Sequence, residues 1–300
     1  MKAFCSANAV AGPVAVIDIG TNTTRLLVAE RDDNGAVVQL ERRTTITSLG
    51  QGVDATGTLA PEAMERVAAA IAEYREVIDR LGADRVVAVA TSAMRDAENG
   101  PAFRDELKER FGVDARTISG DEEARLTFLG ATAGRRADRQ TVVIDIGGGS
   151  TEYVSGRPGL SPDFYESTQM GSVRHTERFL RSDPPTKEEM ESLAEDVRKT
   201  VPRVEAQHGI AVAGTATSLA AIDGADWVHG YTLSLAACER IAAMLAALPL
   251  EERREVDGLH PDRAPTIVAG AVILTESVRT LGLTEVEVSD RDILHGAAAL

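Results

Sequence analysis

The sequence is poor in the residues that build disulfide-bonded and histidine- or cysteine-based metal proteins. Its 300 residues include two cysteines, Cys5 and Cys238, and five histidines. Two cysteines this far apart form no disulfide framework, and neither residue type falls at a metal-binding spacing. We therefore expect free thiols in a reducing cytoplasm, and histidines with surface or core roles.

Long hydrophobic runs and positive charge are also scarce. No apolar run reaches the roughly 20 residues that cross a membrane, and the apolar stretch within residues 1–13 is too broken for a typical signal peptide. The net charge is −15, which argues against a nucleic-acid or membrane-surface partner. An anionic substrate would have to be held by local donors and cations, against the field of the whole molecule.

One motif occurs twice, as VIDIGTNTTRL at 16–26 and VIDIGGGSTEY at 143–153, with six of eleven positions identical. Each copy reads as an apolar strand, a tight polar turn and a second apolar run, which predicts a β-hairpin. Its recurrence indicates a duplicated half-molecule. Strands and helices alternate in both halves, with a helix predicted over 61–82 and another over 186–207 that Pro202 kinks or ends. Each half should therefore contain a mixed sheet flanked by helices.

The turns of the two hairpins, 18–24 and 145–151, predict anion binding. Glycines would let successive backbone N–H groups converge on one anion, although neither turn has the lysine of a P-loop. Asp145 and Glu152 are spaced so that a hairpin can bring their carboxylates together, and a cation such as Mg²⁺ would then have to lie between them. The alternative is a plain hairpin whose aspartate caps its own turn.

Three further segments carry candidate residues. Small residues at 213–221 would expose a helix N-terminus to an anion, unless Thr215 or Thr217 merely caps it. Of the three acids that begin a helix near 121, the first two complement the helix dipole, whereas Glu123 precedes the apolar face and could point inward. Arg95 follows a strand and is either a phosphate ligand or a surface arginine.

Seven ordered motifs carry a resemblance over residues 14–297: VAVIDIGTNTTRLLV, VATSAMRDAENG, ISGDEEARLTFLG, VIDIGGGSTE, MGSVRHTERF, AGTATSLAA and DRAPTIVAGAVIL. They resemble the exopolyphosphatase and guanosine pentaphosphate phosphohydrolase family, within the superfamily of actin, sugar kinases and heat-shock chaperones. The resemblance implies an α/β fold of two actin-like, ribonuclease H-like domains with a cleft between them. The first domain would comprise 1–123 with the C-terminal helix at about 292–300, and the second 124–291.

The resemblance also implies a magnesium-dependent release of the terminal phosphate from a phosphate chain. The catalytic glutamate of the family falls on Glu123, as general base, and the metal-associated acids fall on Asp145 and Glu152. The phosphate contacts fall on the two turns, the 213–221 segment and two arginines: Gly20, Thr21, Asn22, Thr23, Arg95, Gly147, Gly148, Gly149, Ser150, Gly214, Thr215 and Arg263.

The chain departs from the family in two respects. Arg25 occupies the position in the first repeat that Glu152 occupies in the second, so the halves differ chemically. Long family members also continue beyond residue 300, and we therefore expect preference for short inorganic polyphosphate. Separately, we expect a homodimer in the cytoplasm. The alternatives are hydrolysis of guanosine pentaphosphate, a phosphate or nucleotide sensor without turnover, and a kinase by superfamily analogy alone.

Overall fold

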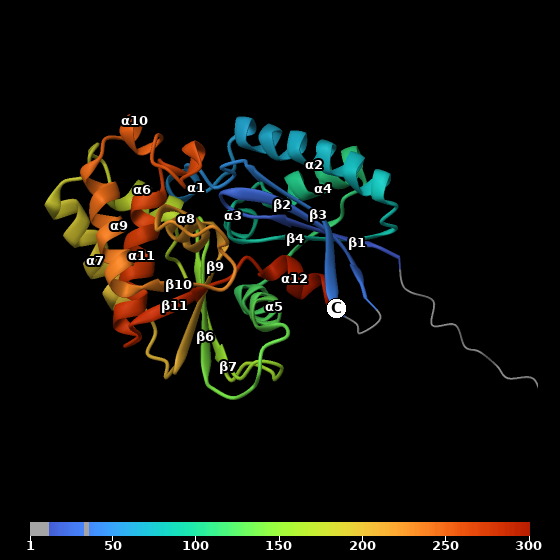
Figure 1. The fold of residues 1–300 in the computed structure, drawn as a ribbon. Helices are drawn as coiled ribbons and strands as arrows, with labels where there is room; N and C mark the ends of the chain where they lie inside the picture. Colours follow the sequence, from blue (N-terminus) through green and yellow to red (C-terminus); the bar gives the residue numbers. More distant parts are fainter. Residues whose placement is uncertain (1–11, 33–35) are drawn as a thin grey trace, which may run out of the picture.

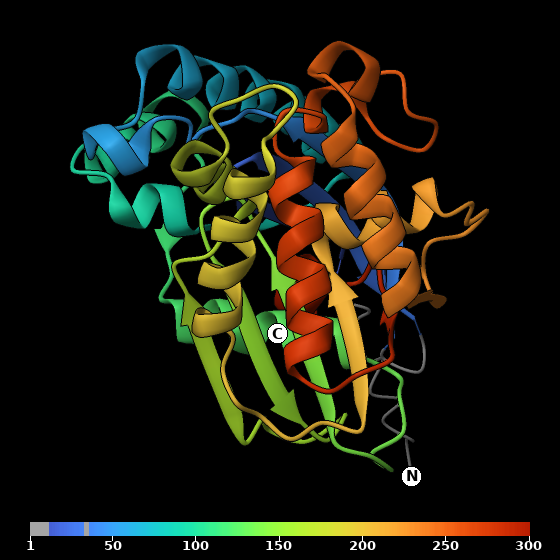
Figure 2. The same cartoon turned by 90° about the vertical axis from the view of Figure 1, so that its left-hand side faces the viewer.

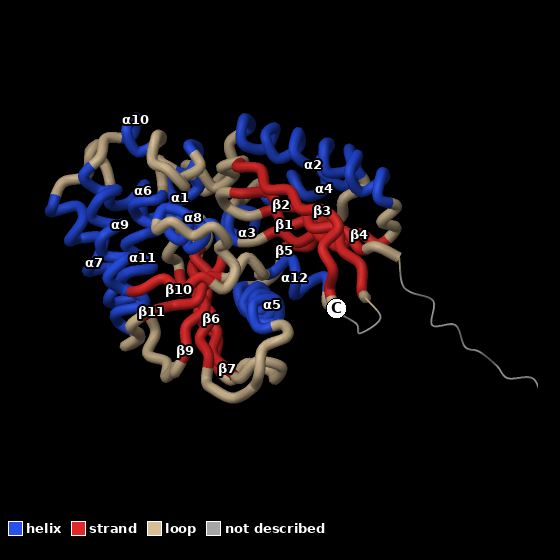
Figure 3. The backbone as a smooth tube through the Cα atoms, in the orientation of Figure 1, coloured by secondary structure: helices blue, strands red, loops and turns tan. Residues whose placement is uncertain are grey.

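The computed structural model describes residues 12–32 and 36–300, which form two β-sheets with helices around each (Figure 1). Cys5 and most of the 1–13 segment lie outside the described residues. Figure 3 shows the sheets as two separate groups of strands, with α5 and α12 between them. The structure confirms the expected α/β class.

The first sheet has the strand order β3-β2-β1-β4-β5. β1 pairs with β2 antiparallel and with β4 in parallel, as a mixed sheet requires. The elements of this half are β1 (Val14–Ile19), β2 (Thr23–Arg31), β3 (Val37–Ile46), α1 (Val53–Thr56), α2 (Pro61–Leu81), β4 (Arg85–Ala90), α3 (Ser92–Asp96), α4 (Gly100–Phe111) and β5 (Ala115–Thr117).

The second sheet has the strand order β10-β11-β9-β6-β7-β8. Its helices α7, α11 and α9 lie side by side over one face (Figure 2). The elements are α5 (Gly120–Thr132), β6 (Thr141–Ile146), β7 (Thr151–Gly156), β8 (Phe164–Thr168), α6 (Ser172–Phe179), α7 (Lys187–Thr200), β9 (His208–Val212), α8 (Ala213–Ile222), β10 (Tyr231–Ser234), α9 (Leu235–Ala247), α10 (Leu250–Arg253), a 3₁₀ turn (Pro261–Arg263), α11 (Ile267–Thr280), β11 (Glu285–Val288) and α12 (Ile293–Ala298).

The central strand of each sheet is buried on both faces, which explains its unbroken apolar sequence. In β1, Ile17 packs toward α2 and α4, whereas Val16 packs on the other face against Leu294 of α12. In β6, Ile144 packs toward α7, α9 and α11, whereas Val143 packs against Phe128 of α5. The two halves thus use the same alternation of side chains.

The repeated motif forms two hairpins with the same register. Asp18 lies opposite Arg25, and Asp145 lies opposite Glu152. The sequence prediction of a duplicated hairpin is confirmed. The turns of the two hairpins lie next to each other, between the two sheets.

Pro202 ends the helix expected over 186–207, which is one of the two outcomes predicted for it. The helix stops at Thr200, because Pro202 has no N–H to continue the ladder and disfavours helical backbone in the preceding residue. Arg95 lies on the short helix α3, just after β4. The helix expected over 61–82 is confirmed as α2, with Pro61 in its first turn and Gly82 in left-handed backbone at its end.

No helix among the described residues is long and apolar enough to cross a membrane. Residues Ile267–Val278 of helix α11 are buried in the second half of the chain. This packing in the core explains the apolar sequence of the helix. The expected domain limits, 1–123 with 292–300 and 124–291, stay a prediction.

Candidate active site

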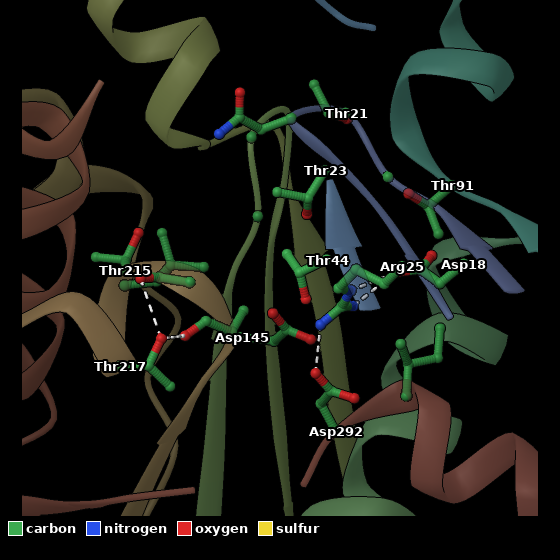
Figure 4. A pocket seen from close by; sticks show the side chains of 18 of the residues that line it. Asp18, Thr21, Thr23, Arg25, Thr44, Thr91, Asp145, Thr215, Thr217 and Asp292 are labelled. Carbon is green, nitrogen blue, oxygen red and sulfur yellow. Dashed lines mark hydrogen bonds and ion pairs between the residues drawn. The ribbon is translucent and has the colours of Figure 1, made fainter. Parts of the chain in front are cut away.

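A cavity of about 130 Å³ lies where the two hairpin turns meet. Figure 4 shows Thr21, Thr23 and Asp18 on one side of it, and Thr215 and Thr217 on the other. Twelve of the predicted site residues line it: Gly20, Thr21, Asn22, Thr23, Glu123, Asp145, Gly147, Gly148, Ser150, Gly214, Thr215 and Arg263. The remaining three, Arg95, Gly149 and Glu152, do not.

The carbonyl groups of the second turn accept hydrogen bonds from residues of α6. The carbonyl oxygen of Gly147 accepts from Ser172 N (2.9 Å), and that of Gly148 accepts from Val173 N (2.9 Å) at the start of α6. The carbonyl of Gly149 accepts from the side chain of Arg174. In a trans peptide the N–H of the next residue points away from the carbonyl. The amides of 148, 149 and 150 therefore face away from α6, and none of them has an acceptor among the described residues.

The first turn has the same arrangement. The carbonyl of Thr21 accepts from Gly50 N (2.8 Å), and the carbonyl of Asn22 accepts from the amides of Thr47 and Ser48. The N–H groups of Asn22 and Thr23 consequently point away from the 47–50 loop. Each turn is thus a run of backbone donors fixed by hydrogen bonds on its far side, which is the geometry of an anion-binding nest.

Glycine is required in the second turn because the two turns approach each other closely. A Cβ on Gly148 would lie 3.0 Å from Thr21 Cβ, and a Cβ on Gly149 would lie 2.6 Å from Ser92 Oγ. At Gly149 the missing side chain leaves room for Ser92 of the first half of the chain, and the residue does not line the main cavity.

The three carboxylates predicted from the sequence lie at or beside the cavity. Asp145 accepts from Thr127 Oγ1 (3.1 Å), Glu152 accepts from Ser167 Oγ (2.8 Å), and Glu123 pairs with Arg95 (3.3 Å). Burial, and then repulsion from Glu152, raise the pKa of Asp145 to about 8. The same two causes raise the pKa of Glu123, although Arg95 opposes them. Glu152 lies directly opposite Asp145 across the hairpin, as its spacing predicted, and is almost fully buried without lining the cavity.

The first hairpin has a different electrostatic balance. Arg25 Nη2 lies 2.5 Å from Asp18 Oδ2, and Arg25 Nη1 pairs with Asp292, which caps α12 (Figure 4). Asp18 Oδ1 is buried without a hydrogen-bond partner among the described residues, and burial raises the pKa of Asp18 although Arg25 opposes it. In the first hairpin Arg25 therefore compensates the charge of Asp18. In the second hairpin two acids, Asp145 and Glu152, lie opposite each other, which leaves an excess of negative charge.

The two predicted arginines lie in different places. Arg95 donates to the carbonyl of Ile118 (2.9 Å) as well as to Glu123, so it supports the start of α5 and does not reach the main cavity. Arg263 lines the cavity and packs on Gly214, where a Cβ would collide with its guanidinium. No acid pairs with Arg263 in residues 12–32 and 36–300. Burial, and then Arg25, lower its pKa to about 10.

The acids of the site fit a divalent cation held jointly with a substrate. No group of three or more His, Cys, Asp or Glu residues within the described ranges forms a complete metal cage. Mg²⁺ usually takes only one or two carboxylates, and completes its shell with water and substrate phosphates. Asp145 has Thr127 as a hydrogen-bond partner and no ion pair among the described residues, and burial raises its pKa to about 8, so a cation in the cavity would favour its charged form.

Sequence reasoning missed several residues of the cavity wall. Arg42 and Thr44 of β3, and Asp290 and Asp292 before α12, also line it. Asp292 had one local signal, as a helix-capping aspartate before an apolar run. Its pairing with Arg25 had none, because the two residues are 267 positions apart.

Comparisons with known proteins agree with this geometry. The sequence profile of the Ppx/GppA phosphatase family matches residues 27–298. The chain is 37% identical to Exopolyphosphatase 2 of Mycobacterium tuberculosis, over 95% of this chain and 97% of that protein. It is 31% identical to Exopolyphosphatase 1 of the same organism, over 92% and 84%.

Solved structures show the same relationship. An exopolyphosphatase-like protein superposes with a TM-score of 0.87 at 34% identity, covering 96% of this chain and 97% of that one. The Ppx/GppA family member of Aquifex aeolicus superposes with a TM-score of 0.79 at 31% identity, covering 96% of both chains. This chain therefore belongs to the Ppx/GppA phosphatase family, with its actin-like two-domain fold, and it is an enzyme of the phosphoric anhydride hydrolase class.

Proposed function

We propose that this enzyme removes the terminal phosphate from short chains of inorganic polyphosphate. The observation that carries the proposal is the pair of inward-facing turns, which offer backbone donors from two sides of one cavity. Backbone amides bind a phosphate without a positively charged surface. This matters in a protein with a net charge of −15, because its overall field repels a polyanion.

The chain end is the part of the substrate that the cavity can enclose. Its volume of about 130 Å³ is well below the roughly 300–1,000 Å³ of sites that surround a drug-sized ligand. Arg263, with no acidic partner in the described part of the chain, would bind the phosphate nearest to α8, together with Gly214 and Thr215. Removal of one terminal unit at a time follows from this size.

Asp145 is the residue that would hold Mg²⁺, with Glu152 behind it adding negative charge. Bound there, the cation would neutralise charge on the phosphates. Thr127 orients the Asp145 carboxylate through its hydrogen bond to Oδ2. The threonine is fully buried on α5, one helical turn after Glu123, so a single helix positions both acids.

Glu123 would act as the general base for the attacking water. Its Oε2 is held by Arg95, and Oε1 has no hydrogen-bond partner in the described residues, so it is free to accept from a water molecule. Burial raises the pKa of Glu123 above its ordinary value, which makes the carboxylate a stronger base, as a general base requires. In-line attack on a terminal phosphoryl group requires chiefly such positioning and charge neutralisation.

We also propose the division into 1–123 with 292–300 and 124–291, together with a cytoplasmic homodimer. The packing of Leu294, Ala297 and Ala298 on β1 and β2 supports the return of the chain end to the first domain. The packing of Ala124 and Phe128 on the second sheet supports a boundary near the start of α5. Light scattering of the purified protein would test the dimer.

A panel of phosphate-release assays tests the proposed function. The substrates are tripolyphosphate, long-chain polyphosphate and guanosine pentaphosphate, each with and without Mg²⁺. We expect the highest kcat/KM for tripolyphosphate, and release only with the metal. Activity on the nucleotide alone would replace this substrate assignment, and tight binding of all three without release would indicate a sensor.

A further inference from the structure

Arg174 of α6 contacts both domains at the rear of the two turns. Its Nε donates to the carbonyl of Gly149 at 2.7 Å. Its Nη2 donates to Asp96 of α3 at 2.6 Å, and its Nη1 pairs with Asp54 of α1. The side chain is only 11% exposed, so three acceptors share one largely buried guanidinium.

These contacts give Arg174 two simultaneous effects. Holding the Gly149 carbonyl on the α6 side points the next amide, that of Ser150, away from α6. Holding Asp54 and Asp96 ties α6 to two helices of the first half, next to the point where Gly149 meets Ser92. The planar fork of arginine suits this geometry, since its donors point in fixed and different directions.

We propose that Arg174 is a positioning residue that couples closure of the two domains to phosphate binding by the second turn. The inference rests on the proposed function, because it assigns the second turn to the substrate phosphate. When the domains are closed, the guanidinium is held by Asp54 and Asp96 and fixes the turn in its donor geometry. Phosphate bound across both turns in return favours the closed arrangement, as linkage requires.

The test compares Arg174→Lys with two other variants, all in a Glu123→Gln background that prevents turnover. Lysine keeps the charge but cannot bind three separated acceptors as a fork. Asp96→Asn removes one contact of the first domain and leaves Gly149 untouched. Arg178→Lys is a second partial variant, because Arg178 lies one turn along the same helix and also binds Asp54, but makes no contact with Gly149.

Two quantities are measured on each variant: the radius of gyration by small-angle X-ray scattering, and the Kd of tripolyphosphate with Mg²⁺ by calorimetry. We expect Arg174→Lys to be more open without ligand and to bind about 10- to 100-fold more weakly, the effect of losing hydrogen bonds to charged groups. Tripolyphosphate should return its scattering curve to that of the parent protein. Asp96→Asn and Arg178→Lys each weaken only a contact with the first half, and each should change both quantities by less.

Equal scattering for parent and Arg174→Lys overturns the inference, and so does equal affinity. An opening without loss of affinity overturns it as well, because the two effects would then be separate. If the parent releases no phosphate from any substrate, the proposed function fails, whereas the scattering and affinity comparisons still decide the role of Arg174. Thermal melting of each variant establishes that it is folded, and Asp96→Asn keeps the test available if Arg174→Lys is not.

Discussion

Arg25 lies across the first hairpin from Asp18 in the register in which Glu152 lies across the second hairpin from Asp145. The replacement of a glutamate by an arginine at this one position gives the two copies of the motif different electrostatic charge. The first hairpin is neutralised internally and fixed to Asp292. The second keeps two adjacent carboxylates, which is why we place the proposed cation on that side of the cavity.

The first prediction concerns the Arg25 network. Arg25→Met should lower the free energy of unfolding by about 3–5 kcal/mol, because it leaves the buried carboxylates of Asp18 and Asp292 without their shared partner. Urea denaturation measures the change. Arg43→Met on the neighbouring strand is the control, since its pair with Glu41 is exposed and should contribute at most about 1 kcal/mol. Equal losses in both variants would contradict the assignment.

The second prediction concerns the general base. Glu123→Gln should lower kcat for tripolyphosphate by roughly 10²–10⁴-fold, the range for a lost general base, without weakening substrate binding. Single-turnover phosphate release measures the chemical step. Glu122→Gln, on the same first turn of α5 but paired outward with Arg116, should retain the parent rate. Near-parent turnover by Glu123→Gln would assign the base to another residue.

The third prediction concerns the metal. Asp145→Asn should raise the Mg²⁺ concentration needed for half-maximal activity and abolish the thermal stabilisation that Mg²⁺ gives the parent. The variant should be no less stable than the parent without metal, because burial already disfavours ionisation of Asp145 and asparagine still accepts from Thr127. Asp121→Asn, exposed at the start of α5, serves as control. An unchanged metal titration would exclude Asp145 as the ligand.

The fourth prediction concerns acid stability. Hydrogen bonding to His208, and then to Arg135, lowers the pKa of Glu287 to about 2, below the ordinary value of about 4.3. The folded carboxyl binds its proton less readily than the unfolded one, so its stabilisation is present above about pH 4.3 and is lost as the pH falls toward 2. The stability difference between parent and Glu287→Gln should therefore shrink between about pH 5 and about pH 3. A stability difference between parent and variant that stays constant over this pH range would contradict the prediction.

The sequence predicted the elements whose signals are local. The repeated VIDIG motif specified both hairpins and their equivalent registers, and Pro61 and Gly82 marked the two ends of α2. Glu123 could be placed inward because it directly precedes the apolar face of its helix. In each case the deciding residues are within a few positions of one another.

The contacts between the two halves could not be predicted in the same way. Gly149 packs against Ser92, and Arg25 forms an ion pair with Asp292. Arg174 forms ion pairs with Asp54 and Asp96. In each case the partner is distant in the sequence. Glu152 could be paired with Asp145, but its depth depends on Ser167 of a third strand. The sequence could not show whether Arg95 binds substrate or supports a helix, because its contacts with the start of α5 depend on the fold.

A crystal structure of Glu123→Gln with tripolyphosphate and Mg²⁺ tests the central claim most directly. The account predicts that the terminal phosphate lies between the amides of Gly148 and Ser150 and those of Asn22 and Thr23, with the cation against Asp145. A chain bound outside this cavity, with both turns free of phosphate, would contradict it.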